Sequence, residues 1–403
     1  MSRLDVERED APPPSSQPAG PRTRTRRTAI RVLQLAAAGL VVLLGAIAIL
    51  VVVAKRSWPA VQLQAVAVLA TTEATPVLAW GVRAVTAEPR IQETRVAKAP
   101  STLVRPGRGD GPWPAVVFVN GATREGRHHP KVQRLARGLA RAGFLVVVPD
   151  LPGLALGKIT LATVAATIDV AKATSEWSNV RDARVGFYGV SVGASLALLA
   201  AESPALADRV TIVGGEAPWV DMKRVIRLAT TGYYDGARYE TDPYASLAIG
   251  RSLAAGLPRS RERTRLLTQL EAVDDDDPRP LAFLGGPYRG GAGRLVALLE
   301  NDDPRRFEGL FLRLPVQVRK AVAALSPFRE ASRLTMPVEL ASAPRDKYFP
   351  PAESRRLADI APNVRVTVTS TLDHAVPEIS VADVADLLRF DGFVVRYLRL
   401  ARG

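Results

Sequence analysis

The stretch RVGFYGVSVGAS, residues 184–195, decides how the rest of the chain is interpreted. Its centre fits the pattern Gly-x-Ser-x-Gly, with Gly189, Ser191 and Gly193 at the fixed positions. The residues before the turn are mostly apolar, as in a buried strand, and residues 194–202 are rich in strong helix formers. A sharp strand-to-helix turn lifts the serine hydroxyl out of a sheet, and flanking glycines let the backbone turn without side-chain clashes. The stretch predicts an exposed nucleophilic serine, with an ordinary glycine-rich turn as the alternative.

The composition restricts the chemistry that the chain can perform. Its 403 residues suit one large domain with additions, or two modest domains. There is no cysteine, which excludes disulfides, thiol nucleophiles and cysteine-ligated zinc. Only three histidines are present, so any histidine-dependent catalysis must use His128, His129 or His374. The formal net charge is +14, but no basic stretch outside the N-terminus is interleaved with aromatic residues, so we do not expect nucleic-acid binding.

The N-terminal region predicts a membrane anchor. Residues 1–31 form a polar tail that we expect to be disordered, and residues 32–54 contain Gln34 as the only clearly polar side chain. At about 1.5 Å per residue, a helix of this length extends roughly 35 Å, enough to cross a bilayer core of about 30 Å. Five arginines closely precede the span, whereas only Lys55 and Arg56 directly follow it. The positive-inside rule therefore places the N-terminus in the cytoplasm and the bulk of the chain outside.

Two alternatives to a single retained anchor stay open. Arg26 and Arg27 resemble part of a twin-arginine export signal, and a cleaved secretory signal is also conceivable, although the apolar stretch is longer than such signals usually carry. Residues 55–90 are interpreted as a juxtamembrane segment, but a second span between residues 58 and 90 is the rival interpretation. Its polar residues would be costly in a bilayer, and it would return the rest of the chain to the cytoplasm.

From residue 91 the pattern changes to short strands that alternate with helices. The run AVVFVN at residues 115–120 is apolar and β-branched, typical of a strand covered on both faces. The other strands are expected at residues 94–97, 102–104, 144–148, 184–188, 210–214, 337–341 and 364–369. Strands that alternate with helices predict an α/β fold with a mainly parallel sheet flanked by helices.

Residues 218–331 interrupt this alternation and are interpreted as an inserted helical cap. Helices are expected at residues 219–230, 245–255, 261–273, 294–300, 305–312 and 316–325. The aspartates at 274–277 are interpreted as a solvated loop rather than a cation site, and we expect no metal and no cofactor. The main domain is therefore expected at residues 91–217 and 332–403.

Two loops after late strands carry the partners that a serine nucleophile needs. Such a serine requires a base that takes its proton and a carboxylate that orients the base. Asp346 follows the expected strand at 337–341, and His374 follows the strand at 364–369. Open α/β sheets place their sites at the carboxyl ends of strands, so we expect Asp346 and His374 to meet Ser191 there.

Other residues compete for the same roles. His128 and His129 lie in a polar loop and are the alternative bases. Glu216 and Asp221 follow the strand at 210–214 and are the alternative acids. Asp150 precedes the serine in the chain and is interpreted as structural.

These motifs resemble the α/β-hydrolase family over about residues 93–217 and 328–398. The resemblance is carried by AVVFVNGA (115–122), VVVPDLPG (146–153), GVSVG (189–193), PVELASAPRDKYFPP (337–351) and STLDHAVPE (370–378). It implies an α/β-hydrolase fold in which the insertion forms the lid, with Ser191 as nucleophile, Asp346 as acid and His374 as base.

The resemblance also implies an oxyanion hole made by the backbone N–H groups of Val192 and Ala122. The family usually carries His-Gly just before the second of these groups, where this chain has Asn120-Gly121. Because the donor is a backbone group, this departure need not abolish the function.

The sequence thus predicts a membrane-anchored serine hydrolase that cleaves carboxylic esters through an acyl-enzyme. Its partners are expected to be a small-molecule ester and the membrane. Apolar faces of the cap, with Leu267 and Phe311 among their residues, are expected to line the substrate pocket. The alternatives are a peptidase of the same fold and a non-catalytic binding protein that keeps the fold.

The anchor leads to a prediction about topology. Because residues 32–54 are expected to span the membrane with the N-terminus inside, protease added to intact cells should degrade the domain that follows residue 57. Immunoblotting against the C-terminal region measures this, with a cytoplasmic protein as the control for cell integrity. Complete protection until the cells are lysed would favour two spans or a cytoplasmic domain.

Overall fold

The computed structural model describes residues 65, 86–275, 277, 287–377 and 384–403, all within one compact unit, Ala60–Gly403. The predicted cytoplasmic tail and the predicted span at residues 32–54 lie outside the described residues, as does most of the juxtamembrane segment. Among the described residues, no helix has both the length and the apolar character that a bilayer crossing requires. Membrane anchoring therefore stays a prediction from the sequence.

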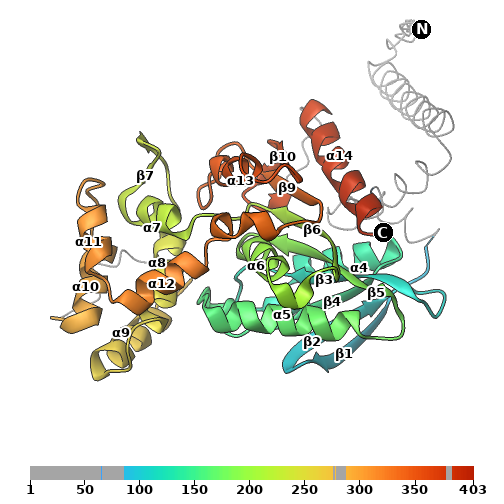
Figure 1. Ribbon diagram of the computed structural model, residues 1–403, viewed down its shortest axis with the longest axis horizontal. Helices are drawn as coiled ribbons and strands as arrows, with labels where there is room; N and C mark the ends of the chain where they lie inside the picture. Colours follow the sequence, from blue (N-terminus) through green and yellow to red (C-terminus); the bar gives the residue numbers. More distant parts are fainter. Residues whose placement is uncertain (1–64, 66–85, 276, 278–286, 378–383) are drawn as a thin grey trace, which may run out of the picture. The chain divides into compact units, whose positions relative to one another are not determined.

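An eight-stranded sheet lies at the centre of the described chain, in the order β1-β2-β4-β3-β5-β6-β9-β10 (Figure 1). Its strands are β1 (Arg90–Val96), β2 (Ala99–Arg105), β3 (Trp113–Val119), β4 (Leu145–Pro149), β5 (Val180–Val190), β6 (Val210–Glu216), β9 (Val338–Ser342) and β10 (Val364–Val368). The pairs β1–β2 and β2–β4 are antiparallel, and all later pairs are parallel. The predicted α/β fold with a mainly parallel sheet is confirmed.

Both faces of the sheet are buried, which explains the continuous apolar runs in its strands. In β3, Ala115, Val117 and Val119 belong to one hydrophobic cluster, while Val116 and Phe118 belong to the other. This alternation is the two-residue period of a strand with a packed layer on each side. The first layer contains α5 (Leu161–Ser175), α6 (Val192–Ala201) and α13 (Pro351–Ala358); the second contains α4 (Pro130–Arg141) and α14 (Val384–Leu400).

The insertion between β6 and β9 is helical, as the sequence predicts. The helices in its described residues are α7 (Met222–Thr231), α8 (Pro243–Ala255), α9 (Arg261–Glu271), α10 (Gly290–Leu299), α11 (Phe307–Arg313) and α12 (Val316–Ala324). A short hairpin of β7 (Tyr233–Tyr234) and β8 (Ala237–Arg238) follows α7. We did not predict it from the sequence, although the Asp235-Gly236 pair at its turn is typical of a two-residue hairpin loop. Two buried charged side chains attach this cap to the main domain.

Glu353 in α13 holds the start of the cap. One of its carboxylate oxygens accepts the backbone N–H groups of Val220 and Asp221, both at 2.7 Å. The other oxygen accepts the hydroxyl of Tyr234. Burial raises the pKa of Glu353, because it removes the hydration shell of the carboxylate. The three hydrogen-bond donors offset part of that loss. The side chain thus fixes the strand-to-cap connection to the helix that follows the Asp346 loop.

Arg251 in α8 is fully buried and makes the second attachment. Its guanidinium donates to the carbonyl oxygen of Leu156 in the main domain at 3.0 Å. It also binds the Asp275 carboxylate at 2.6 Å and the Val273 carbonyl at 2.9 Å. Asp275 therefore does not belong to a purely solvated loop as the sequence suggested, because it neutralises a buried arginine.

The turn between β5 and α6 has the tight geometry that the opening motif predicts. Ser191 has φ 55° and ψ −125°, a conformation that non-glycine residues rarely adopt. A Cβ on Gly189 would lie 2.4 Å from the Cα atom of Ala194, and one on Gly193 would lie 2.0 Å from the carbonyl oxygen of Val119. Both glycines are therefore required by close backbone contacts.

Replacing Gly193 should damage the fold. In Gly193→Ala the new methyl group meets backbone oxygens of β3 and its end, which cannot move aside, so we expect a loss of about 3 kcal/mol or more in the free energy of unfolding. Urea denaturation measures this loss. The matched control is Gly309→Ala in α11, where a Cβ meets nothing within 4 Å and the stability should rise by about 0.5–1 kcal/mol. Equal stability of Gly193→Ala and the wild type would contradict the steric argument.

Candidate active site

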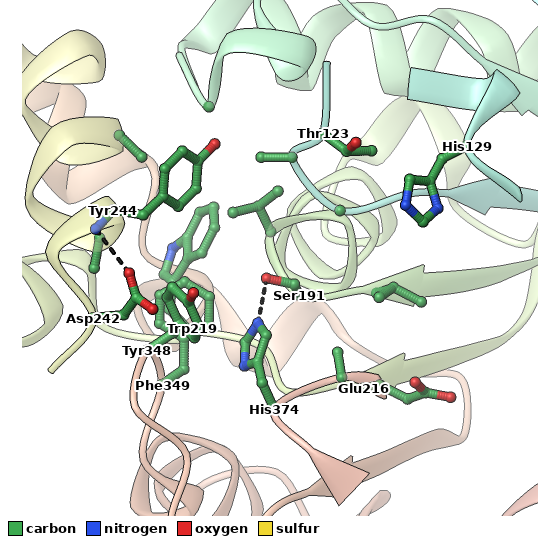
Figure 2. A pocket seen from close by; sticks show the side chains of 18 of the residues that line it. Thr123, His129, Ser191, Glu216, Trp219, Asp242, Tyr244, Tyr348, Phe349 and His374 are labelled. Carbon is green, nitrogen blue, oxygen red and sulfur yellow. Dashed lines mark hydrogen bonds between the residues drawn. The ribbon is translucent and has the colours of Figure 1, made fainter. Parts of the chain in front are cut away.

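A cavity of about 1160 Å³ lies around Ser191 (Figure 2). Its floor is made by residues at the carboxyl ends of strands: Gly121 and Ala122 after β3, Ser191 after β5 and Glu216 at the end of β6. Parallel pairing brings these ends to one edge of the sheet, which is where open α/β sheets bind ligands.

The structure brings together the three side chains that the sequence singled out. His374 Nε2 lies 2.7 Å from Ser191 Oγ, and His374 Nδ1 lies 2.7 Å from Asp346 Oδ2. Figure 2 shows Ser191 and His374 pointing toward each other in the cavity. A carboxylate can only accept, so Nδ1 carries the proton when Asp346 is ionised, and Nε2 of the neutral ring accepts from the serine hydroxyl.

Asp346 is buried and held on both oxygens. Its Oδ1 accepts the backbone N–H groups of Tyr348 and Phe349, both at 2.8 Å, which leaves Oδ2 directed at His374. The loop between β9 and α13 thus folds around its own carboxylate. This arrangement fixes the orientation of the imidazole that the carboxylate contacts.

His374 lies at a turn with φ 54°, between β11 (Leu372–Asp373) and β12 (Val376–Pro377). The rings of Tyr348 and Phe349 flank it, with centroids 4.5 and 5.7 Å from the imidazole centroid. Burial and a hydrogen bond to Asp242 raise the pKa of the Tyr348 hydroxyl, which therefore stays protonated. Asp242 also caps α8 by accepting the N–H of Tyr244 at 2.9 Å, so the acid loop is joined to the cap.

The two predicted oxyanion donors line the same cavity as Ser191. Val192 is the first residue of α6, so its N–H has no carbonyl partner within the helix. Ala122 follows β3, and the preceding Gly121 lies against the nucleophile: a Cβ on Gly121 would be 3.5 Å from Ser191 Cβ. Both N–H groups therefore belong to backbone segments next to Ser191.

The two competing histidines take no part in the hydrogen-bond chain to Ser191, although His129 lines the cavity. His129 caps α4, because its Nδ1 accepts the backbone N–H of Lys131 at 3.2 Å. His128 is exposed at the end of a short helical turn, Gly126–His128. Within the described chain, no hydrogen bond joins either ring to Ser191.

The competing acids are also engaged elsewhere. Asp221 caps α7 through the N–H groups of Lys223 and Arg224. Glu216 accepts the hydroxyl of the buried Tyr188. Asp150 pairs with the Arg127 guanidinium, which agrees with the structural role predicted for it.

The substrate contacts predicted at Leu267 and Phe311 are not found in the cavity. Phe311 is buried in the cap, stacked on Phe307 with a centroid separation of 5.8 Å, and Leu267 is partly buried and packs against the hydrophobic core. The cap residues that line the cavity come from the start of the insertion, from α7 and α8, and from the segments before α8 and after α9: Trp219, Met222, Val225, Asp242, Pro243, Tyr244, Ala245, Ala248, Ile249, Ser252, Asp275 and Asp277. Their position in the chain directly after β6, whose end lies beside Ser191, was the signal that could have identified the first three.

A buried hydrogen-bond pair holds the largest of these wall residues. Ser195 in α6 accepts the backbone N–H of Trp219 at 2.9 Å and donates to its carbonyl oxygen at 2.8 Å. The indole N–H donates to the Leu325 carbonyl oxygen at 2.8 Å. These bonds fix both the backbone and the indole ring of Trp219 in the cavity wall.

Comparison with known proteins supports the fold. Residues 114–378 match the model of a family described as the alpha/beta hydrolase fold. Among solved structures, the chain is similar to an esterase from Pyrococcus furiosus, with 14% identity, coverage of 78% of this chain and 92% of that chain, and a TM-score of 0.42. It is also similar to Est1E from Butyrivibrio proteoclasticus, with 12% identity, coverage of 78% and 99%, and a TM-score of 0.45.

A further similar structure is a puromycin-hydrolyzing peptidase from Mycobacterium tuberculosis, with 18% identity and a TM-score of 0.42. The match covers 78% of this chain and 38% of that one. No curated protein sequence matches the chain.

Proposed function

The chain belongs to the α/β hydrolase family, and we propose that it is a serine hydrolase that cleaves carboxylic esters. The observation that carries the proposal is the unbroken hydrogen-bond chain from Ser191 through His374 to Asp346, at the floor of a cavity with an apolar wall. A buried carboxylate, an imidazole and a serine that lines a cavity, in this order, activate the hydroxyl for attack on an acyl carbon.

The proposed reaction begins when Ser191 Oγ attacks the ester carbonyl carbon while His374 Nε2 takes its proton. Asp346 stabilises the imidazolium, and the N–H groups of Val192 and Ala122 bind the developing oxyanion. Collapse of the intermediate expels the alcohol, which receives the proton from Nε2, and leaves the acyl group on Ser191. Water then attacks the acyl-enzyme with His374 again as the base, and the carboxylic acid leaves.

The apolar walls of the cavity favour a substrate with an apolar acyl group. On the cap side, Trp219, Met222, Val225 and Ile249 present apolar surface to the space beside Ser191. Removing a hydrocarbon chain from water against such a surface is favourable, by about 0.8 kcal/mol for each buried CH₂ group. We therefore place the acyl chain of a short- to medium-chain ester against α7 and α8.

The cellular setting of the proposed enzyme rests on the sequence. An anchor at residues 32–54, with the hydrolase domain outside the cytoplasm, would hold the cavity near the membrane. This location is a proposal that the topology experiment tests separately from catalysis.

The catalytic assignment predicts the effect of single substitutions. Ser191→Ala and His374→Ala should each lower kcat/KM for p-nitrophenyl butyrate by about a thousandfold or more, because each removes a group that acts in the transition state. A fluorophosphonate probe should label the wild type and fail to label Ser191→Ala. The matched controls are His128→Ala and His129→Ala, which should keep activity within about threefold of wild type. Full esterase activity in a folded Ser191→Ala variant would refute the proposal.

The acyl-site assignment predicts a change in chain-length preference. Ile249 lines the cavity and is buried, so Ile249→Ala should lengthen the pocket and raise the ratio of kcat/KM for p-nitrophenyl octanoate over butyrate by about five- to tenfold. Leu267→Ala, which shortens a cap residue outside the cavity, is the matched control and should leave the ratio unchanged. An unchanged ratio in Ile249→Ala, or cleavage of peptide p-nitroanilides without cleavage of esters, would overturn this assignment.

A further inference from the structure

The side chain of Asn120 occupies a buried position where β3 ends beside the nucleophile. Its residue is 1% exposed. A Cβ on Gly193 would lie 2.6 Å from the Asn120 carbonyl oxygen, so the backbone here is pressed against the start of α6. Packing therefore fixes the backbone of Asn120 independently of the hydrogen bonds of its side chain.

The Asn120 amide makes one short hydrogen bond, from Nδ2 to the carbonyl oxygen of Gly121 at 2.7 Å. That oxygen and the N–H of Ala122 belong to the same peptide unit. In a trans peptide the C=O and N–H groups point in opposite directions, so fixing one fixes the other. The amide of Asn120 thus sets the direction of the Ala122 N–H.

The peptide that Asn120 holds lies directly beside Ser191. A Cβ on Gly121 would be 3.4 Å from the carbonyl oxygen of Val190 and 3.5 Å from Ser191 Cβ. Hydrogen bonds from an oxyanion hole depend strongly on direction, and a preorganised donor needs no rearrangement during the reaction. A peptide free to rotate at this point would lose part of that preorganisation.

The oxygen atom of the Asn120 amide makes no comparable hydrogen bond within the described chain. Asn120 Oδ1 is buried without a hydrogen-bond partner within the described chain. The nitrogen must face the Gly121 oxygen, because two acceptors would repel each other. The donor function of the side chain is therefore the part that the site uses.

We propose that Asn120 is a positioning residue for the oxyanion hole, which orients the Gly121–Ala122 peptide so that the Ala122 N–H faces the developing negative charge. The inference rests on the proposed function, since it requires an oxyanion to form at Ser191. It also gives a role to the asparagine that stands where the family usually has histidine.

Asn120→Leu tests the role of the donor, since leucine fills a similar volume without one. We expect kcat/KM for p-nitrophenyl butyrate to fall about ten- to hundredfold. The inhibition constant of an aliphatic trifluoromethyl ketone, whose adduct with serine carries an oxyanion, should rise by the same factor. The inhibition constant of the product butyrate, which forms no such adduct, should stay within about twofold of wild type.

Asn301 supplies a matched control. It is also buried, its Nδ2 donates to a backbone carbonyl oxygen, that of Asp303 at 2.9 Å, and its Oδ1 is likewise without a partner in the described chain. It lies in the cap after α10, outside the cavity lining. Asn301→Leu therefore removes the same kind of hydrogen bond and should leave the trifluoromethyl ketone constant unchanged.

Asn120→Asp keeps the shape of the side chain and adds a pH-dependent readout. A protonated carboxyl can donate to the Gly121 oxygen, whereas a carboxylate repels it. Burial raises the pKa of such a carboxyl, so the activity of the variant relative to wild type should rise as the pH falls. Taking the ratio of the two activities at each pH removes the pH dependence that both proteins share.

The outcomes separate this inference from the proposed function. If the wild type shows no Ser191-dependent ester cleavage, the proposed function fails. If that cleavage is present but Asn120→Leu binds the trifluoromethyl ketone as tightly as wild type, only the role of Asn120 fails. Should Asn120→Leu not fold, Asn120→Asp decides alone, and a relative activity that does not change with pH overturns the inference.

Discussion

The contact between the start of α6 and the end of β3 is the constraint on which the site depends. Gly193 lies so close to the carbonyl oxygens of Val119 and Asn120 that no side chain fits between them. Because Val119 also pairs with Gly189 in the sheet, the end of β3 is held against both sides of the turn that carries Ser191. The nucleophile and the peptide after Gly121 are therefore brought together by backbone packing, and the strained φ of Ser191 is maintained by the same contacts.

The other half of the site depends on the register of two later strands. Val368 at the end of β10 pairs with Ser342 at the end of β9, and the N–H of Thr369 donates to the Ser342 carbonyl oxygen at 3.1 Å. The loops that leave these strands thus begin side by side, one carrying Asp346 and the other His374. Parallel pairing of β9 and β10 therefore brings together two loops that are distant in sequence. The two backbone N–H groups that donate to Asp346 then orient its carboxylate toward His374.

Those features of the site that depend on local sequence pattern and on the order of residues along the chain could be predicted from the sequence. The glycines around Ser191 are required by sterics, and Asp346 and His374 follow recognisable strands, so these three residues could be named together. The apolar face of a helix reveals burial but not the partner, so this pattern did not lead to the cap residues at the cavity, although the position directly after β6 was a signal for the first of them. Phe311 satisfies that pattern by stacking on Phe307, and Leu267 by packing against the core. The bond from Asn120 to Gly121 has no sequence signature, since it depends on the conformation of one peptide.

The cap and the loop that carries Asp346 are held by the same hydrogen bonds, which limits how independently the two segments can vary. Asp242 caps α8, receives the Tyr348 hydroxyl, and donates its own N–H to the Lys347 carbonyl oxygen at 3.3 Å. Lys347 also pairs with Glu240 at 2.8 Å, although this pair is exposed and contributes little by itself. On the other side of the Asp346 loop, Glu353 holds the first residues of the cap. A movement of α7 or α8 would therefore be transmitted to the loop that orients His374. Substitutions that reshape the apolar wall of the cavity should, for this reason, be placed on the cavity side of these helices, away from the bonds at Asp242 and Glu353.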